Sequence, residues 1–461
     1  MRFKRIIAGV LTFCIVGGVL STVNMVTNNA VIVNAEYTMS TYEQLTYENY
    51  GDHIEISDCD KLATEVIIPS EINGVPVITI CDGAFSGCTN LTSIKVPDSV
   101  TNIGDGAFSG CTNLMSIKIP DSVTIISYYA FMGCDNLTSI EIPDGVTSIE
   151  RDAFMNCDNL TSIEIPNSVT SIGTGAFEHC KSLTSIEIPN SVTSIGGDAF
   201  SYCSGLVSVT IPDSVTSIGM YAFASCKSLT SVTIASNVTS IKKSVFYKTP
   251  WFEAKCAENP LVIINNILID GTTCSGDVVI PDGVTSIGED AFSGCTGLTS
   301  IEIPDSVTNI GRCAFCNCTS LTSIEISKNI INIGFNAFAY TPWLSKNAKE
   351  NPLFIVNDIL ICGYCYEGDV IIPDGVKIIA GGAFSSGSAA FSDNRTTSIS
   401  IPDSVTNIGE NAFMGCEKLK SITIPESITS IEDNIFYGCK SLTSIKIPEN
   451  VTSIGNYAFY E

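Results

Sequence analysis

Apolar residues recur along this chain with a period of 23 residues, which is longer than the period of any single helix or strand. The repeated unit reads approximately I-P-D-S-V-T-S-I-G-x-x-A-F-x-x-C-x-x-L-T-S-I-E. A period of about 20–50 residues is typical of solenoids, in which each repeat forms one coil that packs on its neighbours. The pattern therefore predicts a solenoid. An Ile-Pro or Val-Pro step marks the period at Val96, Ile119, Ile142, Ile165, Ile188 and Ile211.

The segment that begins one coil, residues 160–165, shows how the pattern predicts a strand. Leu160, Ile163 and Ile165 have the L-x-x-L-x-L spacing of leucine-rich repeats. Ser162 and Glu164 lie between them, so that apolar and polar side chains alternate as in a half-buried strand. We therefore expect the three apolar side chains to face the core and the two polar ones to face the solvent.

The rest of the same coil is predicted to be a turn, a second short extended segment and a short helical turn. Pro166 begins the first turn, because its ring presets the backbone there. Val169 and Ile172 then return to the core. Phe177 lies in the helical turn, on the opposite side of the coil.

A phenylalanine recurs at this last position in about 15 coils, the first being Phe85 and the last Phe459. Equivalent positions of successive coils stack on one another in a solenoid. The pattern therefore predicts a ladder of buried phenylalanine rings. Truncating one ring, as in Phe154→Ala, should lower the free energy of unfolding by about 3–5 kcal/mol.

Residues 36–80 do not follow the repeat and are predicted to form an N-terminal β cap. Residues 53–57 and 64–68 alternate like half-buried strands, and the Asn-Gly pair within 72–77 is typical of a hairpin turn. A cap covers the unpaired edge and the apolar side chains that a first coil would otherwise expose. The solenoid itself is predicted over residues 81–461.

Two segments of the solenoid, 249–280 and 341–372, depart from the unit in the same way. They align without a gap at an offset of 92 residues, which is four repeats. Each has Thr-Pro-Trp and then two apolar runs about an Asn-Asn or Asn-Asp pair, which predicts a short helix followed by a hairpin. Their tryptophans, Trp251 and Trp343, either pack over the hairpin or form a binding feature raised from the solenoid wall. A further insertion, 385–395, is predicted to be a surface loop.

The first 35 residues have the pattern of a signal peptide. Arg2, Lys4 and Arg5 precede an apolar run over residues 6–20, and residues 33–35 resemble a small-residue cleavage site. The mature chain would then be secreted and would have no transmembrane span. The alternative is an uncleaved membrane anchor, although the apolar run is shorter than the ~20 residues that a spanning helix needs.

The formal net charge of −25 narrows the class of partner. Nucleic acids and anionic membranes attract basic surfaces, so this acidic chain is not predicted to bind either. The chain has only two histidines, which leaves little for histidine-centred catalysis or zinc binding. No cofactor, metal or catalytic residue is predicted.

More than half of the 20 cysteines share one repeat position. Neighbouring coils lie about 4.8 Å apart with parallel side chains, whereas a disulfide needs converging Cβ atoms about 3.8 Å apart. A ladder of reduced, buried thiols is therefore predicted in preference to a disulfide framework. A second pattern, Cys313-x-x-Cys316 with Cys362-x-x-Cys365, is compatible with a metal site, a local disulfide or isolated thiols. The ladder consists of Cys88, Cys111, Cys134, Cys157, Cys180, Cys203, Cys226, Cys295, Cys318, Cys416 and Cys439.

The outward positions of the predicted strands form a polar ladder, which is the candidate binding surface. Adjacent glutamates would lie about 5 Å apart, a carboxylate spacing that retaining glycosidases also use. This spacing follows from stacking alone, however, and an open face desolvates no carboxylate relative to its neighbour. We therefore predict binding rather than catalysis. The candidate residues are Lys95, Lys118, Glu141, Glu164, Glu187, Thr210, Thr233, Glu302 and Glu325, together with Trp251 and Trp343.

The unit I-P-x-S-V-T-S-I-G-x-x-A-F-x-x-C-x-x-L-T-S-I closely resembles the BspA-like class of leucine-rich repeats over nearly all of residues 68–461. The Thr-Pro-Trp segments also look like a variant unit of that family. The resemblance implies an α/β repeat solenoid with a 23-residue period, short parallel β-strands and short helical turns. It also implies a secreted or surface-exposed protein, some relatives of which adhere to host matrix proteins such as fibronectin and fibrinogen. The family supplies no catalytic residues.

Two functions follow as hypotheses. The first is an extracellular, non-enzymatic binding or adhesion protein, whose strand face binds host or cell-surface proteins, or glycans, through many weak contacts. The second is a structural spacer module of a secreted or cell-surface protein. A secreted enzyme would need a pocket at the hairpin segments, which the sequence does not show. Replacing Glu141, Glu164 and Glu187 by alanine should weaken a binder and leave a spacer unaffected.

Overall fold

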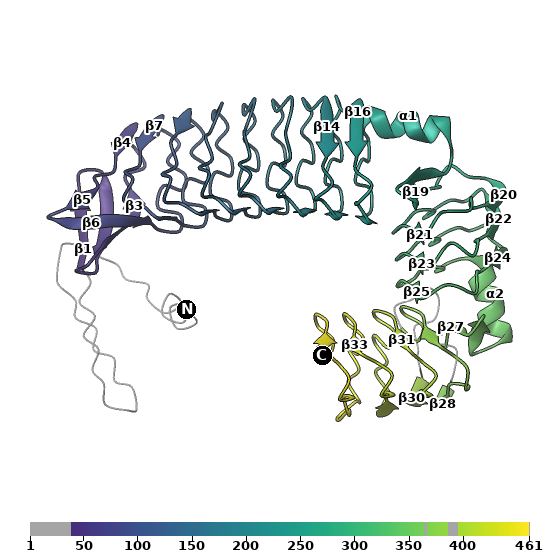
Figure 1. Cartoon of the computed structure of the whole chain (residues 1–461). Coiled ribbons are helices and arrows are strands. Elements are labelled where there is room, and N and C mark those ends of the chain that lie inside the picture. The colour runs from purple at the N-terminus through teal and green to yellow at the C-terminus, as the bar shows by residue number, and fades with distance from the viewer. Residues whose placement is uncertain (1–37, 364–366, 386–394, 461) are drawn as a thin grey trace, which may run out of the picture. The chain divides into compact units, whose positions relative to one another are not determined.

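The computed structural model describes residues 38–363, 367–385 and 395–460. The chain divides between Pro166 and Asn167 into two compact units, and each is described by itself. The predicted signal peptide, most of the predicted 385–395 loop and Cys365 lie outside the described residues. Both units are β-solenoids, as the 23-residue period predicts, and Figure 1 shows their coils as successive loops of similar outline.

The first unit begins with the antiparallel strands β1 (Thr38–Tyr42), β2 (Leu45–Asn49) and β3 (Ile54–Cys59). The strand predicted at residues 53–57 is confirmed as β3, whereas β1 and β2 were not predicted. The predicted hairpin is confirmed as β5 (Glu71–Ile72) and β6 (Val75–Ile80), which pair antiparallel. Its turn residues Asn73 and Gly74 have φ of 55° and 80°, the left-handed conformation that Asn and Gly adopt most readily.

Parallel stacking starts within the segment that was predicted to be the cap. The strand predicted at 64–68 is confirmed as β4 (Glu65–Ile67), and it pairs parallel with β7 (Ser93–Lys95). Strand β6 likewise pairs parallel with β8 (Asn102–Ile103). Residues 65–80 therefore already form a coil, in which the Asn-Gly hairpin replaces the usual Pro-Asp-Ser turn and β6 supplies the strand that Thr-Ser-Ile forms in ordinary coils.

Ordinary coils of the first unit stack in parallel along two edges, as short strands or, at Glu141 and Glu164, as single bridges. Strand β7 pairs with β9 (Ser116–Ile117), Ser93 opposite Ser116 and Ile94 opposite Ile117. On the other edge, β10 (Ile125–Ile126) pairs with β11 (Ser148–Ile149). In both sheets the paired residues are one 23-residue repeat apart. Residues at the same position of successive repeats therefore face each other.

The predicted short helical turns are hydrogen-bonded turns rather than helices. Cys88 N donates to Phe85 O over 3.0 Å within the turn, and Phe85 N donates to Ala107 O of the next coil over 2.8 Å. Each turn is therefore linked to the next by main-chain hydrogen bonds, so that all three sides of a coil are stacked.

The second unit repeats this arrangement in three runs of coils that two variant blocks separate (Figure 1). The strands of the first run are β12 (Ser171–Ile172), β13 (Ser194–Ile195), β14 (Ser208–Ile211), β15 (Ser217–Ile218), β16 (Ser231–Ile234) and β17 (Ser240–Ile241). The second run has β20 (Gly276–Val279), β21 (Ser286–Ile287), β22 (Leu298–Glu302), β23 (Asn309–Ile310), β24 (Ser323–Glu325) and β25 (Asn332–Ile333). The third has β28 (Glu367–Ile371), β29 (Ile378–Ile379), β30 (Arg395–Ser400), β31 (Asn407–Ile408), β32 (Ser421–Thr423), β33 (Ser430–Ile431) and β34 (Ser453–Ile454).

Each variant block is the predicted helix followed by the predicted hairpin. The first has α1 (Pro250–Glu258), β18 (Val262–Ile264) and β19 (Ile267–Asp270), and the second has α2 (Pro342–Glu350), β26 (Phe354–Val356) and β27 (Ile359–Cys362). The helices begin at Thr-Pro because the threonine hydroxyl caps the helix: Thr249 Oγ1 accepts from Phe252 N at 3.2 Å. Strand β19 then pairs parallel with β21, which returns the chain to the solenoid register.

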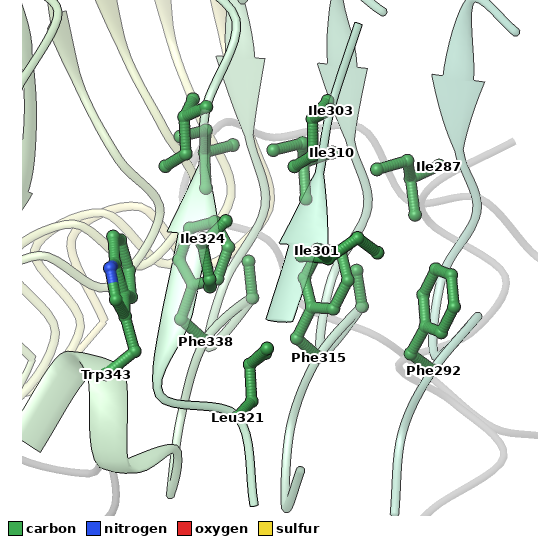
Figure 2. Close-up of a cluster of buried hydrophobic side chains, with 14 of the residues drawn as sticks. Ile287, Phe292, Ile301, Ile303, Ile310, Phe315, Leu321, Ile324, Phe338 and Trp343 are labelled. Atoms are coloured by element: carbon green, nitrogen blue, oxygen red, sulfur yellow. The ribbon is translucent and has the colours of Figure 1, made fainter. Parts of the chain in front are cut away.

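Buried phenylalanine rings stack through the core, as predicted. In the second run of coils, Phe315 lies 5.1 Å from Phe292 and 5.6 Å from Phe338 between ring centroids, with nearly parallel planes. Figure 2 shows this row ending at Trp343, whose ring meets Phe338 at 61°. The stack therefore ends where the variant block begins.

The cysteine ladder is a set of buried thiols, in agreement with the reduced-ladder prediction. Thiols of ordinary coils donate to the carbonyl oxygen of the phenylalanine in the preceding coil, for example Cys111 Sγ to Phe85 O over 3.1 Å and Cys203 Sγ to Phe177 O over 3.1 Å. After the first variant block, Cys295 Sγ donates to Cys274 O instead, over 3.0 Å. The phenylalanine carbonyl group already accepts one main-chain hydrogen bond in its own turn. The thiol thus satisfies a buried acceptor a second time while filling an apolar space.

We expect the ladder thiols to react only after unfolding. Burial raises the pKa of Cys111, Cys226 and Cys439 to about 12, so that near pH 8 little thiolate forms. Titration with Ellman's reagent under non-reducing conditions should therefore find them silent in the folded protein and reactive in guanidinium. Recovery of few thiols from the unfolded chain would contradict the reduced ladder.

Candidate binding face

The outward positions of the first strand of each coil form the surface that we call the strand face. In the first unit, Lys95, Lys118, Glu141 and Glu164 are all exposed there. In the second unit, Glu187, Thr210, Thr233, Glu302 and Glu325 are exposed in the same way. Alternation along a strand produces this arrangement, because the residues on either side of each one point into the core.

Three carboxylates of the first unit gather at one place on the strand face. Lys118 pairs with Glu141 and Glu141 with Glu164 in parallel bridges, so the three side chains follow one another across successive coils. An open hollow of about 430 Å³ lies here, and its lining includes Glu141, Asp144 and Glu164 with the hydroxyl-bearing Ser139 and Ser162. Such a surface offers hydrogen-bond acceptors and negative charge to a cationic or donor-rich group.

The carboxylates of this hollow are not arranged as a general acid and its partner. Both glutamates are exposed on an open surface, whereas a catalytic acid with a shifted pKa needs a desolvated or specifically charged environment. Among the described residues, no group of three or more His, Cys, Asp or Glu side chains could hold a metal ion.

On the second unit the strand face is arranged in the same register. Glu302 lies opposite Glu325 and Ser300 opposite Ser323 in parallel strands, and Thr210 lies opposite Thr233. Identical or similar side chains therefore repeat at the spacing of the coils, which is about 4.8 Å.

Two aspartates that the sequence analysis did not single out anchor this face next to the variant blocks. Asp277 Oδ1 accepts from Ser300 Oγ at 2.6 Å and from Thr299 Oγ1 at 3.0 Å, and these hydrogen bonds lower the pKa of Asp277. Asp369 does the same with Ser398 and Thr397, and its pKa is lowered for the same reason. The sequence did contain a signal for these two aspartates, because the gap-free alignment of the two blocks places Asp277 at the same position as Asp369.

A second hollow, of about 1120 Å³, lies on the second unit along the Thr-Ser-Ile-Gly edge of the coils. Its lining carries both signs of charge, including Lys242, Arg312, Glu289 and Glu410. Contacts across the second variant block help to shape it, because Phe335 N donates to Glu410 Oε1 at 3.3 Å although the two residues are 75 positions apart. The sequence analysis did not predict this surface, because no local sequence pattern indicates that Phe335 and Glu410 are in contact.

The structure places one of the two candidate tryptophans in the core and leaves the other half-buried. Trp343 is 6% exposed and meets both Phe338 and Phe354 edge to face, with ring centroids 5.1 Å away in each case. Trp251 is half-buried and meets Phe246 in the same way at 4.8 Å. These contacts favour the packing interpretation, and we do not retain Trp343 among the partner-binding candidates.

Of the two C-x-x-C pairs, the structure describes both cysteines only of the first, Cys313 and Cys316. These two cysteines lie in one turn, in which Cys316 N donates to Cys313 O over 3.0 Å. Cys362 is buried, and Cys365 lies outside the described residues.

Within the described part of the chain, no helix has both the length and the apolar character needed to cross a membrane.

Comparison with known proteins gives one family and several similar structures. The family described as "BspA type Leucine rich repeat region (6 copies)" matches residues 57–182, 147–267, 263–389 and 385–461. A leucine rich cell surface protein from Faecalibacterium prausnitzii A2-165 is 29% identical, with a TM-score of 0.42 over 89% of this chain and 94% of that one. A leucine-rich repeat protein of T. pallidum is also 29% identical, with a TM-score of 0.35 over 48% of this chain and 95% of that one. No curated protein matches the chain.

Proposed function

Because this chain belongs to the family of BspA type leucine-rich repeat proteins, we propose that it is an extracellular, non-enzymatic binding protein that contacts its partners through the strand face. Leucine-rich repeat proteins of this kind serve binding or structural roles, and fold alone does not choose between them. The choice must rest on the surface of this chain.

The observation that carries the proposal is the register of exposed side chains on the strand face. Parallel pairing places Glu141 beside Glu164, and Glu302 beside Glu325, all exposed. A repetitive surface of this kind binds through many weak, equivalent contacts, and its avidity grows with their number. It needs no deep pocket.

The charge of the face indicates the chemistry of the partner. The hollow at Glu141 and Glu164 carries carboxylates and hydroxyls, and the chain has a formal net charge of −25. Partners with basic or donor-rich surfaces would therefore be favoured, and nucleic acids disfavoured. Extracellular and cell-surface proteins, including host matrix proteins, and glycans are the partners that we propose, with the chain secreted or held at the cell surface.

A structural spacer is the second candidate, and the stacked core within each unit favours it. In the second unit, for example, stacked phenylalanine rings and main-chain hydrogen bonds join successive coils, which needs no partner. The two functions differ in what the exposed glutamates do.

The test is capture of fibronectin, fibrinogen, mucin or bacterial cells by immobilised protein, compared with Glu141→Gln, Glu164→Gln and Glu187→Gln combined. Each exposed charged contact is worth about 0.2–1 kcal/mol, so the triple variant should bind about tenfold more weakly. The matched control removes the same number of charges elsewhere, at the exposed residues Glu71, Glu253 and Glu350, and should bind normally. Equal capture by both variants would remove the strand face from the proposal, and no capture by any form would favour the spacer.

A further inference from the structure

A pair of contacting thiols lies in the turn that follows β23. Cys316 N donates to Cys313 O over 3.0 Å, so that one tight turn places the two cysteines next to each other and their thiols interact. Neither cysteine belongs to the ladder of buried thiols. The ladder residue of this coil is Cys318.

Ordinary coils show that the contact is a property of the turn. Asp198 and Ser201 occupy the equivalent positions of another coil, where Ser201 N donates to Asp198 O over 2.9 Å. The next coil has Asn336 and Ala339 there, with the same main-chain bond at 3.0 Å. The solenoid therefore holds these two positions together, and this one coil puts a cysteine at both.

The two thiols differ in exposure and in electrostatic environment. Cys313 is partly exposed, whereas Cys316 is 8% exposed and accepts from Asn317 Nδ2 at 3.4 Å. The hydrogen bond from Cys316 and the guanidinium of Arg312 lower the pKa of Cys313 to about 7, and the pKa of Cys316 is raised. A partly exposed thiolate beside a cation, next to a buried second thiol, is the arrangement of reactive dithiols.

The charges around the pair do not cancel this effect. Asp290 of the preceding coil opposes the thiolate, but it forms an ion pair with Lys243 at 3.0 Å. From the following coil, Phe335 presents its ring to Arg312 at 5.5 Å and its carbonyl oxygen accepts from Cys313 N at 2.9 Å. Arg312 is thus held beside the thiol.

We propose that Cys313 and Cys316 form a redox-active dithiol that exchanges with low-molecular-weight disulfides. The Cys313 thiolate attacks one sulfur of the disulfide RS–SR, forms Cys313–S–S–R and releases RS⁻, which takes a proton from water. The Cys316 thiol then attacks the Cys313 sulfur, and its proton goes to the second departing RS⁻. The protein thiols are oxidised to one disulfide, and RS–SR is reduced to two RSH.

A second contacting pair shows why exposure selects this site. The thiols of Cys59 and Cys88 also interact, and Lys61 Nζ lies 3.8 Å from Cys88 Sγ. Both are buried, at 3% and 0% exposed, so that a dissolved disulfide cannot reach them in the folded protein. This pair is an internal control for contact without access.

The experiment incubates the reduced, full-length folded protein with oxidised glutathione or with cystine, quenches in acid, alkylates the remaining thiols and maps the peptides by mass spectrometry. The Cys313–Cys316 disulfide should form roughly tenfold faster or more than any other and revert with dithiothreitol. Cys316→Ala, which copies Ala339, should accumulate glutathione on Cys313. Cys313→Asn, which copies Asn336 and suits the left-handed φ of 51°, should abolish both products.

Arg312→Gln tests whether Arg312 lowers the pKa of Cys313, by a measurement that a purely structural role of Arg312 would leave unchanged. The rate of Cys313 alkylation should rise with pH along a curve displaced to higher pH in this variant, while the melting temperature is unchanged. The proposal would be overturned by a Cys313–Cys316 disulfide that forms no faster than Cys59–Cys88. It would also be overturned by Cys316→Ala protein that gains no glutathione although its circular dichroism spectrum is native.

Discussion

Replacing Phe315 by alanine is expected to lower the free energy of unfolding by about 3–5 kcal/mol. Phe315 is completely buried and stacks on Phe292 and Phe338, so the substitution removes ring contacts on both sides and leaves a cavity in the middle of a coil. Neighbouring coils cannot close this cavity, because main-chain hydrogen bonds hold their spacing. Guanidinium unfolding followed by circular dichroism measures the loss.

Phe459→Ala is the matched control for this prediction. Phe459 belongs to the same ladder but is 42% exposed and stacks only on Phe436, at 5.5 Å. Its truncation should cost about 1 kcal/mol or less, since water can fill the space. If the two variants unfolded at the same denaturant concentration, burial within the ladder would not be what stabilises the coils.

Gly271→Ala is expected to destabilise the protein by about 1–3 kcal/mol, which is unusual for the addition of one methyl group. Gly271 takes the place of a ladder residue in the first variant block, and a Cβ there would overlap the buried ring of Phe292. Gly363 has the same relation to Phe384 in the second block. Steric overlap, and not backbone conformation, therefore requires glycine at both positions.

Gly145→Ala serves as the control, because its nearest neighbour would be Asp121 O at 3.3 Å and serine holds the equivalent position in other coils. Its stability should stay within about 0.5 kcal/mol of the native value. A double-mutant cycle sharpens the test, since Phe292→Leu should partly relieve Gly271→Ala. Strictly additive losses would show that the two residues do not compete for space.

The 23-residue period predicted the coils, the register and the inward-facing residues correctly. Turn chemistry was equally informative: Asn265-Asn266 and Asn357-Asp358 each close a hairpin with φ between 47° and 62°, which these residues tolerate at low cost. The start of each helix is also a local feature, because the threonine hydroxyl caps the helix and the proline that follows suits its first turn. These features depend on a residue and its immediate neighbours, or on equal positions one coil apart.

Other features carried no comparable signal. Strands β1 and β2 precede the repeat and were missed, and nothing in the sequence explained Gly271 until Phe292 was seen to lie over it. The role of Trp343 was left open between packing and binding, and its contacts with Phe338 and Phe354 favour packing.

The sequence by itself thus determined that this protein is a leucine-rich repeat solenoid with an exposed, polar strand face, because periodic patterning specifies which side of a strand is buried. Only the tertiary structure decided which side chains of different coils meet: the hydrogen bonds at Asp277, the stacking of Arg312 on Phe335 and the contact of Phe335 with Glu410. The physical reason is the range of the interactions. Burial follows from local alternation, whereas contacts between different coils depend on how turns and variant blocks set those coils against one another.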